Sequence, residues 1–344
     1  LSGGIDSSLI TALLQSQQKN PISSFTISFP DDNYAKNKFF NEAPYAKLVS
    51  EYLGTNHTEV ALTYKDAQQV IPNLSKIYSE PFADSSQVPT FLVCSEAKKA
   101  GLSVMMSGDG GDELFGGYNR HKYAPFIHKR FSKLNPYLRN IISQSIKYLP
   151  IRERGLNLEK KQKLYRAIRN SNGINSIYDS LISAFSYENI PLSNEWLLDN
   201  FMSLTSFPES LTLSEQIMFK DLVFYLPSDL LVKIDRASMN VSLETRAPFL
   251  DYRVAELAWS CPLQFKIKNS GYSYKTKWAL KEILKRYVPK EIIERPKCGF
   301  AMPIGTWLKG PLRNWADQLL DPSLISDYGY LNSKKVRDIW NNHI

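Results

Sequence analysis

Two segments of this 344-residue chain combine glycine with hydroxyl and acidic side chains in patterns that suit phosphate chemistry. The first is SGGIDSS, residues 2–8, directly before an apolar run at 9–15. Its glycines allow close backbone approach, and the amides at a helix N-terminus attract anions. It lacks the GK[ST] ending of a Walker loop, so we expect phosphate to be held differently from a P-loop kinase. The competing interpretation, a Ser-Gly turn with a helix cap, is weaker for this longer pattern.

The second segment, SGDGGDELFGGY, covers residues 107–118 and begins at the end of the short apolar run SVMMS. It holds five glycines and three acids. At the carboxyl edge of a sheet, such a loop lets the backbone approach a ligand while carboxylates hold Mg²⁺ bridged to phosphate oxygens. We therefore predict Asp6 and Asp112 as metal ligands. The alternative is a surface acidic turn.

The elements that must position these loops follow an alternating order. Helical spacing marks 9–15, 43–53 and 86–100, whereas β-rich or short apolar runs mark 22–29, 57–62 and 103–107. This order predicts an α/β fold, a doubly wound parallel sheet with helices on both faces, over residues 1–120. Ligands bind at the carboxyl ends of strands in such sheets. Residues 121–344 read as mainly helical.

Composition narrows the class of protein. The 42 Lys and Arg exceed the 34 Asp and Glu by eight, which suits an anionic substrate, a nucleic acid or a solvated helical face, the last being favoured for 122–169. Three scattered cysteines argue against disulfides and favour the cytoplasm. The four histidines lack metal-ligand spacing, and no run of about 18 apolar residues could span a membrane. Both ends of the chain are expected to be cut. The chain starts without Met and without a strand before the first loop, and it ends within a helical pattern.

Four motifs in order carry a family resemblance. SGGIDSS, SGDGGDELFGGY, LPSDLLVKIDRASMNVSLETRAPFLDYR and RPKCGF reach from residue 1 to about 300. Together they resemble glutamine-dependent asparagine synthetases, in the synthetase domain of the SGGxDSS-type ATP pyrophosphatase family. Other enzymes with such loops, including tRNA-modifying enzymes, GMP synthetase and NAD synthetase, lack the later motifs.

The resemblance implies an adenine nucleotide α-hydrolase-like fold, with 121–344 completing the same synthetase domain. It places ATP at a set of loop and strand residues: Leu1, Ser2, Gly3, Gly4, Asp6, Ser7, Ser8, Ser28, Ser107 and Gly108. Mg²⁺ would lie on Asp6 and Asp112. The aspartate carboxylate would form an acyl-adenylate, and ammonia from glutamine would convert it to asparagine. The N-terminal glutaminase domain of the family is absent from this chain, and the family usually works as a cytoplasmic homodimer.

Two catalytic residues are implied by the same resemblance. Lys297 in RPKCGF matches the lysine that neutralises charge on the adenylate and the departing phosphate. Asp109 stands where better-known asparagine synthetases have Glu, as the base that takes a proton from ammonia. Its shorter reach points to a changed substrate geometry. Cys298 beside Lys297 has no partner His nearby in sequence, which argues against a nucleophilic role.

The segment 226–251 is predicted as a helix after Leu226-Pro227 through Met239, followed by a turn at 246–251. Its many charges either form a buried ion-pair network or line the substrate pocket, with scaffold roles favoured for Arg246 and Asp251. Family positions beside the nucleotide are also matched by three residues of SEPFADSS: Glu80, Asp84 and Ser85.

Two rival functions stay open. The same chemistry could act on another carboxylate, such as a uronic acid of a surface polysaccharide, a peptide carboxylate or an intramolecular acid. A different class, a tRNA-binding or tRNA-modifying protein, is suggested by the positive charge but has no zinc pair, CxxC or RNA-binding aromatic motif to support it.

Overall fold

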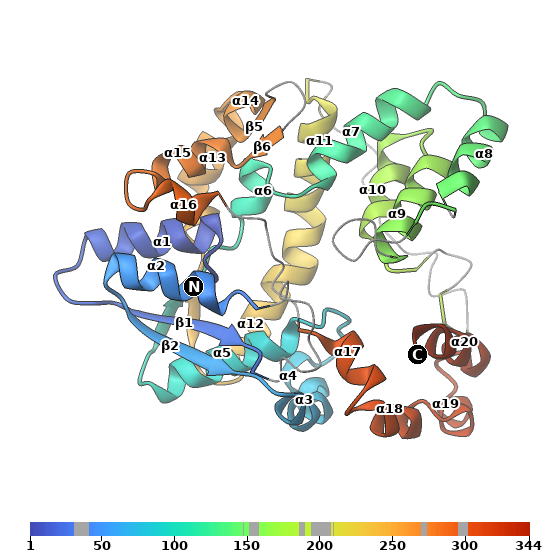
Figure 1. Cartoon of the computed structure of the whole chain (residues 1–344), viewed down its shortest axis with the longest axis horizontal. Helices are drawn as coiled ribbons and strands as arrows, with labels where there is room; N and C mark the ends of the chain where they lie inside the picture. Colours follow the sequence, from blue (N-terminus) through green and yellow to red (C-terminus); the bar gives the residue numbers. More distant parts are fainter. Residues whose placement is uncertain are drawn as a thin grey trace. The chain divides into compact units, whose positions relative to one another are not determined.

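The computed structural model describes residues 1–30, 41–146, 148–150, 158–185, 190–193, 208, 210–269, 274–294 and 302–344. These residues form two compact units (Figure 1). The first comprises 1–117, 222–318 and 343–344, and the second comprises 118–221 and 319–342. The predicted division at residue 120 falls near the boundary after Gly117, and 222–318 rejoins the first unit.

Parallel strands and covering helices make the first unit an α/β structure, as predicted. Strand β1, Ser23–Ser28, pairs in parallel with β2, Asn56–Ala61. Helices α2, Ala43–Leu53, and α5, Gln87–Lys99, pack against this pair, and Figure 1 shows them on opposite faces. Gly54 ends α2 in the left-handed conformation, at φ 70°. Strand β1 is buried from Ser24 to Ser28, as expected for a strand covered on both faces, whereas in β2 only Val60 is buried.

A second parallel ladder carries the glycine-rich loop. Strand β3, Val104–Met106, pairs with β4, Glu244–Arg246, and the Ser107 amide extends the ladder by donating to the Arg246 carbonyl at 2.8 Å. The sequence predicted only a turn at 246–251. That interpretation was wrong at its start, because a three-residue strand of polar residues has no apolar alternation and forms through its partner.

The remaining elements of the first unit are short helices and one hairpin. They are α1 Ile5–Ser16, α3 Tyr64–Val70, η1 Ile71–Asn73, α4 Leu74–Tyr78, α6 Gly111–Phe115, α12 Val232–Met239, η5 Pro248–Leu250, α13 Tyr252–Ser260, α14 Leu263–Lys266, β5 Ile267–Asn269, β6 Tyr274–Thr276, α15 Trp278–Leu284, α16 Lys290–Ile293, α17 Ile304–Lys309 and α18 Arg313–Leu319. One core lies around β1, β2 and α5, and includes Leu62 and Trp307. Another joins α1 to α15 through residues such as Leu9 and Leu280.

The helix predicted after Pro227 begins earlier than expected. Pro227 lies inside η4, a π-helical segment at Asp221–Leu231 that continues directly into α12. In an α-helix a proline would lose its hydrogen bond and its ring would clash with the carbonyl four residues before. Here Pro227 lies in a segment with i→i+5 geometry, and the helix continues through it into α12.

The second unit is helical. Its elements are α7 Arg120–Phe131, α8 Pro136–Ile146, α9 Leu158–Arg169, α10 Ile174–Ile182, α11 Leu213–Lys220, α19 Pro322–Tyr328 and α20 Ser333–His343. Its buried polar centre is Asp221, which is fully buried and accepts hydrogen bonds from Arg120, Tyr178 and the His121 ring. Burial alone would raise the pKa of Asp221, but His121 and Arg120 outweigh it and hold the pKa below its ordinary value. Among the described residues, no helix is long and apolar enough to cross a membrane.

Replacing Leu62, which is fully buried beside β2, tests the core of the first unit. We expect Leu62→Ala to lower the free energy of unfolding by about 2–5 kcal/mol, since the lost contacts leave a cavity. Urea denaturation would measure this. The control is Leu48→Ala on α2, where the side chain is 52% exposed and the expected change stays within about 0.5 kcal/mol. Equal effects of the two changes would contradict this core assignment.

Candidate functional site

The SGGIDSS loop folds back on itself before α1. Gly3 has φ 68°, and the Ser2 hydroxyl lies 2.9 Å from that of Ser7 and accepts from the Gly4 amide at 3.1 Å. A β-carbon at Gly3 would come within 2.8 Å of the Tyr45 backbone. Both the left-handed conformation and this close approach therefore require glycine at position 3.

Helix α1 begins at this loop with its N-terminus uncapped by a side chain. Gly4 is the N-cap, so the residue preceding the helix supplies no oxygen to the first amides. Such amides, together with the helix dipole, favour an anion. Ser8 is buried, and its hydroxyl has no hydrogen-bond partner within the described part of the chain.

The two predicted metal ligands converge on one positive charge. The Lys277 ammonium forms an ion pair with Asp6 and another with Asp112, whose Oδ1 lies 2.7 Å from Nζ. Burial by itself would lower the pKa of Lys277, but the Asp112 and Asp6 carboxylates outweigh it and raise the pKa above its ordinary value. Three segments remote in sequence thus meet at a single ammonium.

The glycines of the second loop make room for this cluster. A β-carbon at Gly111 would lie 2.5 Å from the Asp6 carboxylate, and one at Gly108 would lie 2.9 Å from the Asp6 β-carbon. At Gly117 it would lie 1.7 Å from Asp112 Oδ1 and 2.1 Å from Lys277 Cε. The density of glycine in residues 107–118 therefore serves the packing of charged side chains around Asp6 and Asp112.

The chemistry of the Asp6 and Asp112 pair fits Mg²⁺. Mg²⁺ commonly takes one or two protein carboxylates and completes its shell with phosphate oxygens and water. Both carboxylates already point at one cationic centre, the Lys277 ammonium. No group of three or more His, Cys, Asp or Glu side chains suited to a metal occurs among the described residues. Phosphate oxygens and water would complete the shell of a divalent cation held by Asp6 and Asp112.

Asp109 lies in the same glycine-rich loop as Asp112, and its carboxyl is within the field of the Asp112 charge. It accepts a hydrogen bond from Ser107 and lies in the field of Lys233, and burial raises its pKa above the ordinary value. A carboxylate with a raised pKa accepts a proton more readily, which suits a general base.

Lys233 forms a second charged cluster with two more carboxylates. Its ammonium lies 2.6 Å from Asp84, which also accepts from the Ser86 amide and hydroxyl at 2.8 Å each. Burial would raise the pKa of Asp84, but Lys233 and Ser86 hold it below the ordinary value. The side chain of Asp229, on η4, is hydrogen-bonded to Asp84. Burial and the charge of Asp84 together raise the pKa of Asp229 to about 6.

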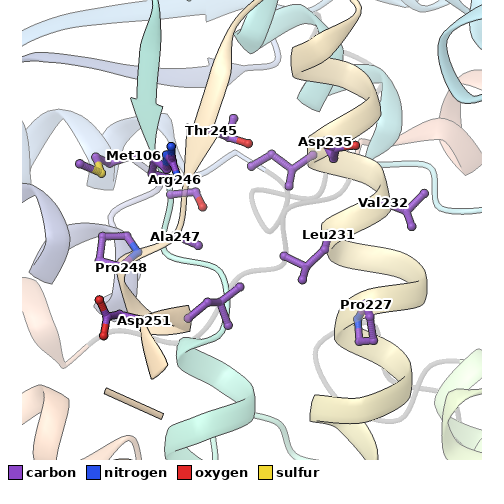
Figure 2. A pocket seen from close by; sticks show the side chains of 13 residues that line it. Met106, Pro227, Leu231, Val232, Asp235, Thr245, Arg246, Ala247, Pro248 and Asp251 are labelled. Carbon is purple, nitrogen blue, oxygen red and sulfur yellow. The ribbon is translucent and has the colours of Figure 1, made fainter. Parts of the chain in front are cut away.

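A cavity of about 830 Å³ opens beside Ser107. In Figure 2 its labelled residues come from the helix formed by η4 and α12, from strands β3 and β4, and from the segment 247–251 that follows β4. The lining consists of Met106, Ser107, Pro227, Leu231, Val232, Ile234, Asp235, Thr245, Arg246, Ala247, Pro248, Leu250 and Asp251.

Arg246 and Asp251, for which scaffold roles are predicted, both line this cavity. The Arg246 side chain is 68% exposed and pairs with Glu244, whereas Asp251 pairs with Arg253 at 2.8 Å. Lys233, whose side chain is 10% exposed, does form a largely buried ion pair, with Asp84. Arg246 reaches the cavity from the end of the short strand β4, which the sequence did not predict.

The other predicted residues occupy separate places. Ser28 is buried at the carboxyl end of β1, and the Leu1 nitrogen donates to the Phe25 carbonyl at 2.6 Å. Lys297 and Cys298 lie outside the described residues. The structure therefore brings the first loop, Gly108 and Asp112 together, with Asp109 nearby in the chain beside Ser107.

Comparison with known proteins accounts for this arrangement of loops. The family model described as asparagine synthase matches residues 1–344. The chain belongs to the asparagine synthase family. A curated relative named asparagine synthetase [glutamine-hydrolyzing] 1, from Bacillus subtilis, is 29% identical over 337 residues, 95% of this chain and 50% of that protein. A putative asparagine synthetase [glutamine-hydrolyzing] from Mycobacterium tuberculosis is 33% identical over 321 residues, 92% of this chain and 46% of its own length.

The chain spans about half the length of these asparagine synthetase relatives.

Two charged residues of the site were missed by sequence reasoning. Lys277 stands in the basic stretch SYKTKWALKEILKR, where nothing distinguishes it from its neighbours. Asp229 gave a weak signal, because it is a single acid in the apolar run FYLPSDLLV.

Gly117 tests the fit around Lys277. We expect Gly117→Ala to lower the free energy of unfolding by about 1–3 kcal/mol, since its methyl group would overlap Asp112 and Lys277. Thermal or urea unfolding would measure it. In the control Gly173→Ala, the new β-carbon would lie 4.0 Å from Ser176 Oγ, in ordinary van der Waals contact, and φ is −145°. Because Gly173 is the N-cap of α10, where alanine is less favoured than glycine, that variant should lose less than about 1 kcal/mol. An unchanged Gly117→Ala would contradict the packing described.

Asp229 predicts a pH dependence of stability. Its folded pKa of about 6 exceeds the ordinary value of 3.8. The folded protein therefore keeps a proton that the unfolded chain loses, and the stability contributed by this group falls as pH rises from about 4 to about 6. Asp229→Asn removes this loss, so relative to wild type it should gain about 1 kcal/mol between those pH values, a figure reduced for partial exposure.

Urea denaturation at several pH values would measure the Asp229 effect. Asp338→Asn, at an exposed position on α20, is the control and should follow the wild-type profile. A difference between Asp229→Asn and wild type that is constant across this range would show that the Asp229 carboxyl titrates normally.

Proposed function

We propose that this chain is an ATP-dependent amide-forming ligase that activates a carboxylate as its adenylate. The observation that carries the proposal is the meeting of Asp6 and Asp112, from two glycine-rich loops, beside the uncapped N-terminus of α1. An anion at α1 and a cation at the carboxylates would be neighbours, which is what a magnesium–polyphosphate complex requires.

In this proposal ATP lies along the first loop. Its phosphates accept from the amides and hydroxyls of residues 2–8, and its adenosine lies near Leu1, Ser28, Ser107 and Gly108. Asp6 and Asp112 would hold Mg²⁺, which when bound neutralises phosphate charge. The chain's own part is to orient the α-phosphorus toward the acceptor and to hold the departing pyrophosphate.

Two bond exchanges complete the proposed reaction. An acceptor carboxylate oxygen attacks the α-phosphorus, the bond to the bridging oxygen breaks, and pyrophosphate leaves. Ammonia then attacks the acyl carbon, loses a proton to Asp109, and AMP departs with the amide left behind. The raised pKa of Asp109 supports its assignment as the base. Lys297 is proposed to neutralise the charge that develops on the adenylate and pyrophosphate.

Aspartate is the acceptor we favour, and glutamine the source of nitrogen. The support is the printed name of the relatives, asparagine synthetase [glutamine-hydrolyzing]. Because the chain spans about half of those proteins, we assign glutamine hydrolysis to a glutaminase domain outside these 344 residues. The 344 residues alone should then use free ammonia and not glutamine.

A larger carboxylate, such as a uronic acid, is the second candidate acceptor. Two observations favour it. The cavity beside Ser107 has a volume of about 830 Å³, within the range of sites for much larger ligands than free aspartate. Asp109, shorter by one carbon than the Glu of better-known asparagine synthetases, would also place the reacting carbon differently.

Pyrophosphate release from ATP and ammonia tests the function. With Mg²⁺ present, we expect release that depends on aspartate more than on glucuronate or other acids. Asp112→Asn should reduce it at least about 100-fold, because charge on the phosphates is no longer neutralised. Asp327→Asn, at an exposed position on α19, should keep wild-type activity.

Other outcomes of the pyrophosphate assay would redirect the proposal. Release with a different acid would keep the chemistry and replace the acceptor. No release with any acid, from folded full-length protein, would reject the ligase. A filter-binding assay with tRNA would then test the nucleic-acid alternative through its dependence on salt.

A further inference from the structure

Lys277 occupies the place that a cation would take between the proposed metal ligands. Its side chain is 6% exposed, and those of Asp6 and Asp112 are 17% and 19% exposed. Two carboxylates brought this close repel each other unless a positive charge lies between them. The lysine supplies that charge from within the chain.

The backbone fixes Lys277 in this position. It has φ 51°, in the left-handed region, and forms the N-cap of α15. Its amide donates to the Phe115 carbonyl at the end of α6, at 3.2 Å. Gly117 leaves the space that the Lys277 stem fills. A non-glycine residue in this conformation is costly and persists where its surroundings hold it.

We propose that Lys277 stands in for the divalent cation in the nucleotide-free protein, so that this site binds a metal ion only together with a polyphosphate. Lys277 is then a positioning residue that keeps Asp6 and Asp112 in place for the metal. The inference rests on the proposed nucleotide site but requires no particular acceptor.

Charge balance supplies the reason for this coupling. Two carboxylates and one ammonium leave a single net negative charge, which attracts a dication weakly. A dication a few ångströms from the ammonium is also repelled by it. A polyphosphate at the N-terminus of α1 adds several negative charges, so that the ammonium and the metal ion can both be neutralised. If the ammonium is removed, the two carboxylates should bind the metal ion even in the absence of phosphate.

Manganese binding tests the proposal without an activity assay. Free Mn²⁺ would be counted by electron paramagnetic resonance in titrations of wild type, Lys277→Met and Lys285→Met, each with and without pyrophosphate. The Mn²⁺ bound by pyrophosphate in protein-free samples would be subtracted. Lys285 is the matched control because it forms an exposed ion pair with Glu282, 2.6 Å away. Wild type and Lys285→Met should bind Mn²⁺ at least about tenfold more tightly with pyrophosphate. Lys277→Met should bind Mn²⁺ alone at least about tenfold more tightly than wild type does.

Thermal unfolding gives a second measurement. Mn²⁺ alone should raise the melting temperature of Lys277→Met and leave that of wild type unchanged, because a metal that binds the folded state stabilises it. Lys277→Arg keeps the charge and should retain the requirement for pyrophosphate. If Lys277→Met does not fold, tight binding of Mn²⁺ by wild type or Lys277→Arg in the absence of pyrophosphate would still overturn the stand-in role.

Two results would overturn the proposal, and they differ in what else they reject. Tight binding of Mn²⁺ to wild type in the absence of pyrophosphate would reject the stand-in role and leave the proposed function intact. No Mn²⁺ binding by any variant, even with pyrophosphate, would reject the metal site itself and with it the proposed nucleotide chemistry.

Discussion

The ion pairs of Lys277 with Asp6 and Asp112 set the conditions that the rest of the site must meet. Three parts of the chain, at residues 6, 112 and 277, have to bring their charges to one point inside the first unit. Like charges can be buried together only if an opposite charge is held between them. The left-handed backbone at Lys277, the glycines at 108, 111 and 117, and the short helix α6 all serve that arrangement.

The sequence predicted most of the elements that position this cluster, for clear physical reasons. Apolar periodicity identified β1, α2, β2, α5 and β3, and Gly54 marked the end of α2 through its left-handed conformation. These signals are local, since each depends on a few neighbouring residues. The α/β fold class followed from their order. Strand β4 was missed because its three residues carry no pattern of their own, and its pairing with β3 is a contact between distant segments.

The candidate site was predictable where loops carry chemistry, and unpredictable where one side chain arrives from afar. Asp6 and Asp112 were recognisable because glycine and hydroxyl residues surround them. Lys277 was not, since a lysine in a basic stretch usually lies in solvent and only the fold reveals that this one is 6% exposed. Asp229 likewise depends on Asp84 and Lys233, which come from other segments. Pro227 misled the prediction because proline normally ends an α-helix, and η4 is a π-helix.

The fit at Gly117 ties together positions that are far apart in sequence. Its missing β-carbon leaves the volume in which the Asp112 carboxylate and the Lys277 stem lie side by side. A larger residue at position 117 therefore fits only if the side chain at position 277 or 112 is shorter. Either of these changes alters the charge at the centre of the site. Among natural variants of this domain, substitutions at positions 112, 117 and 277 should therefore occur together. A larger residue at position 117 should appear only where position 112 or 277 already has a smaller side chain.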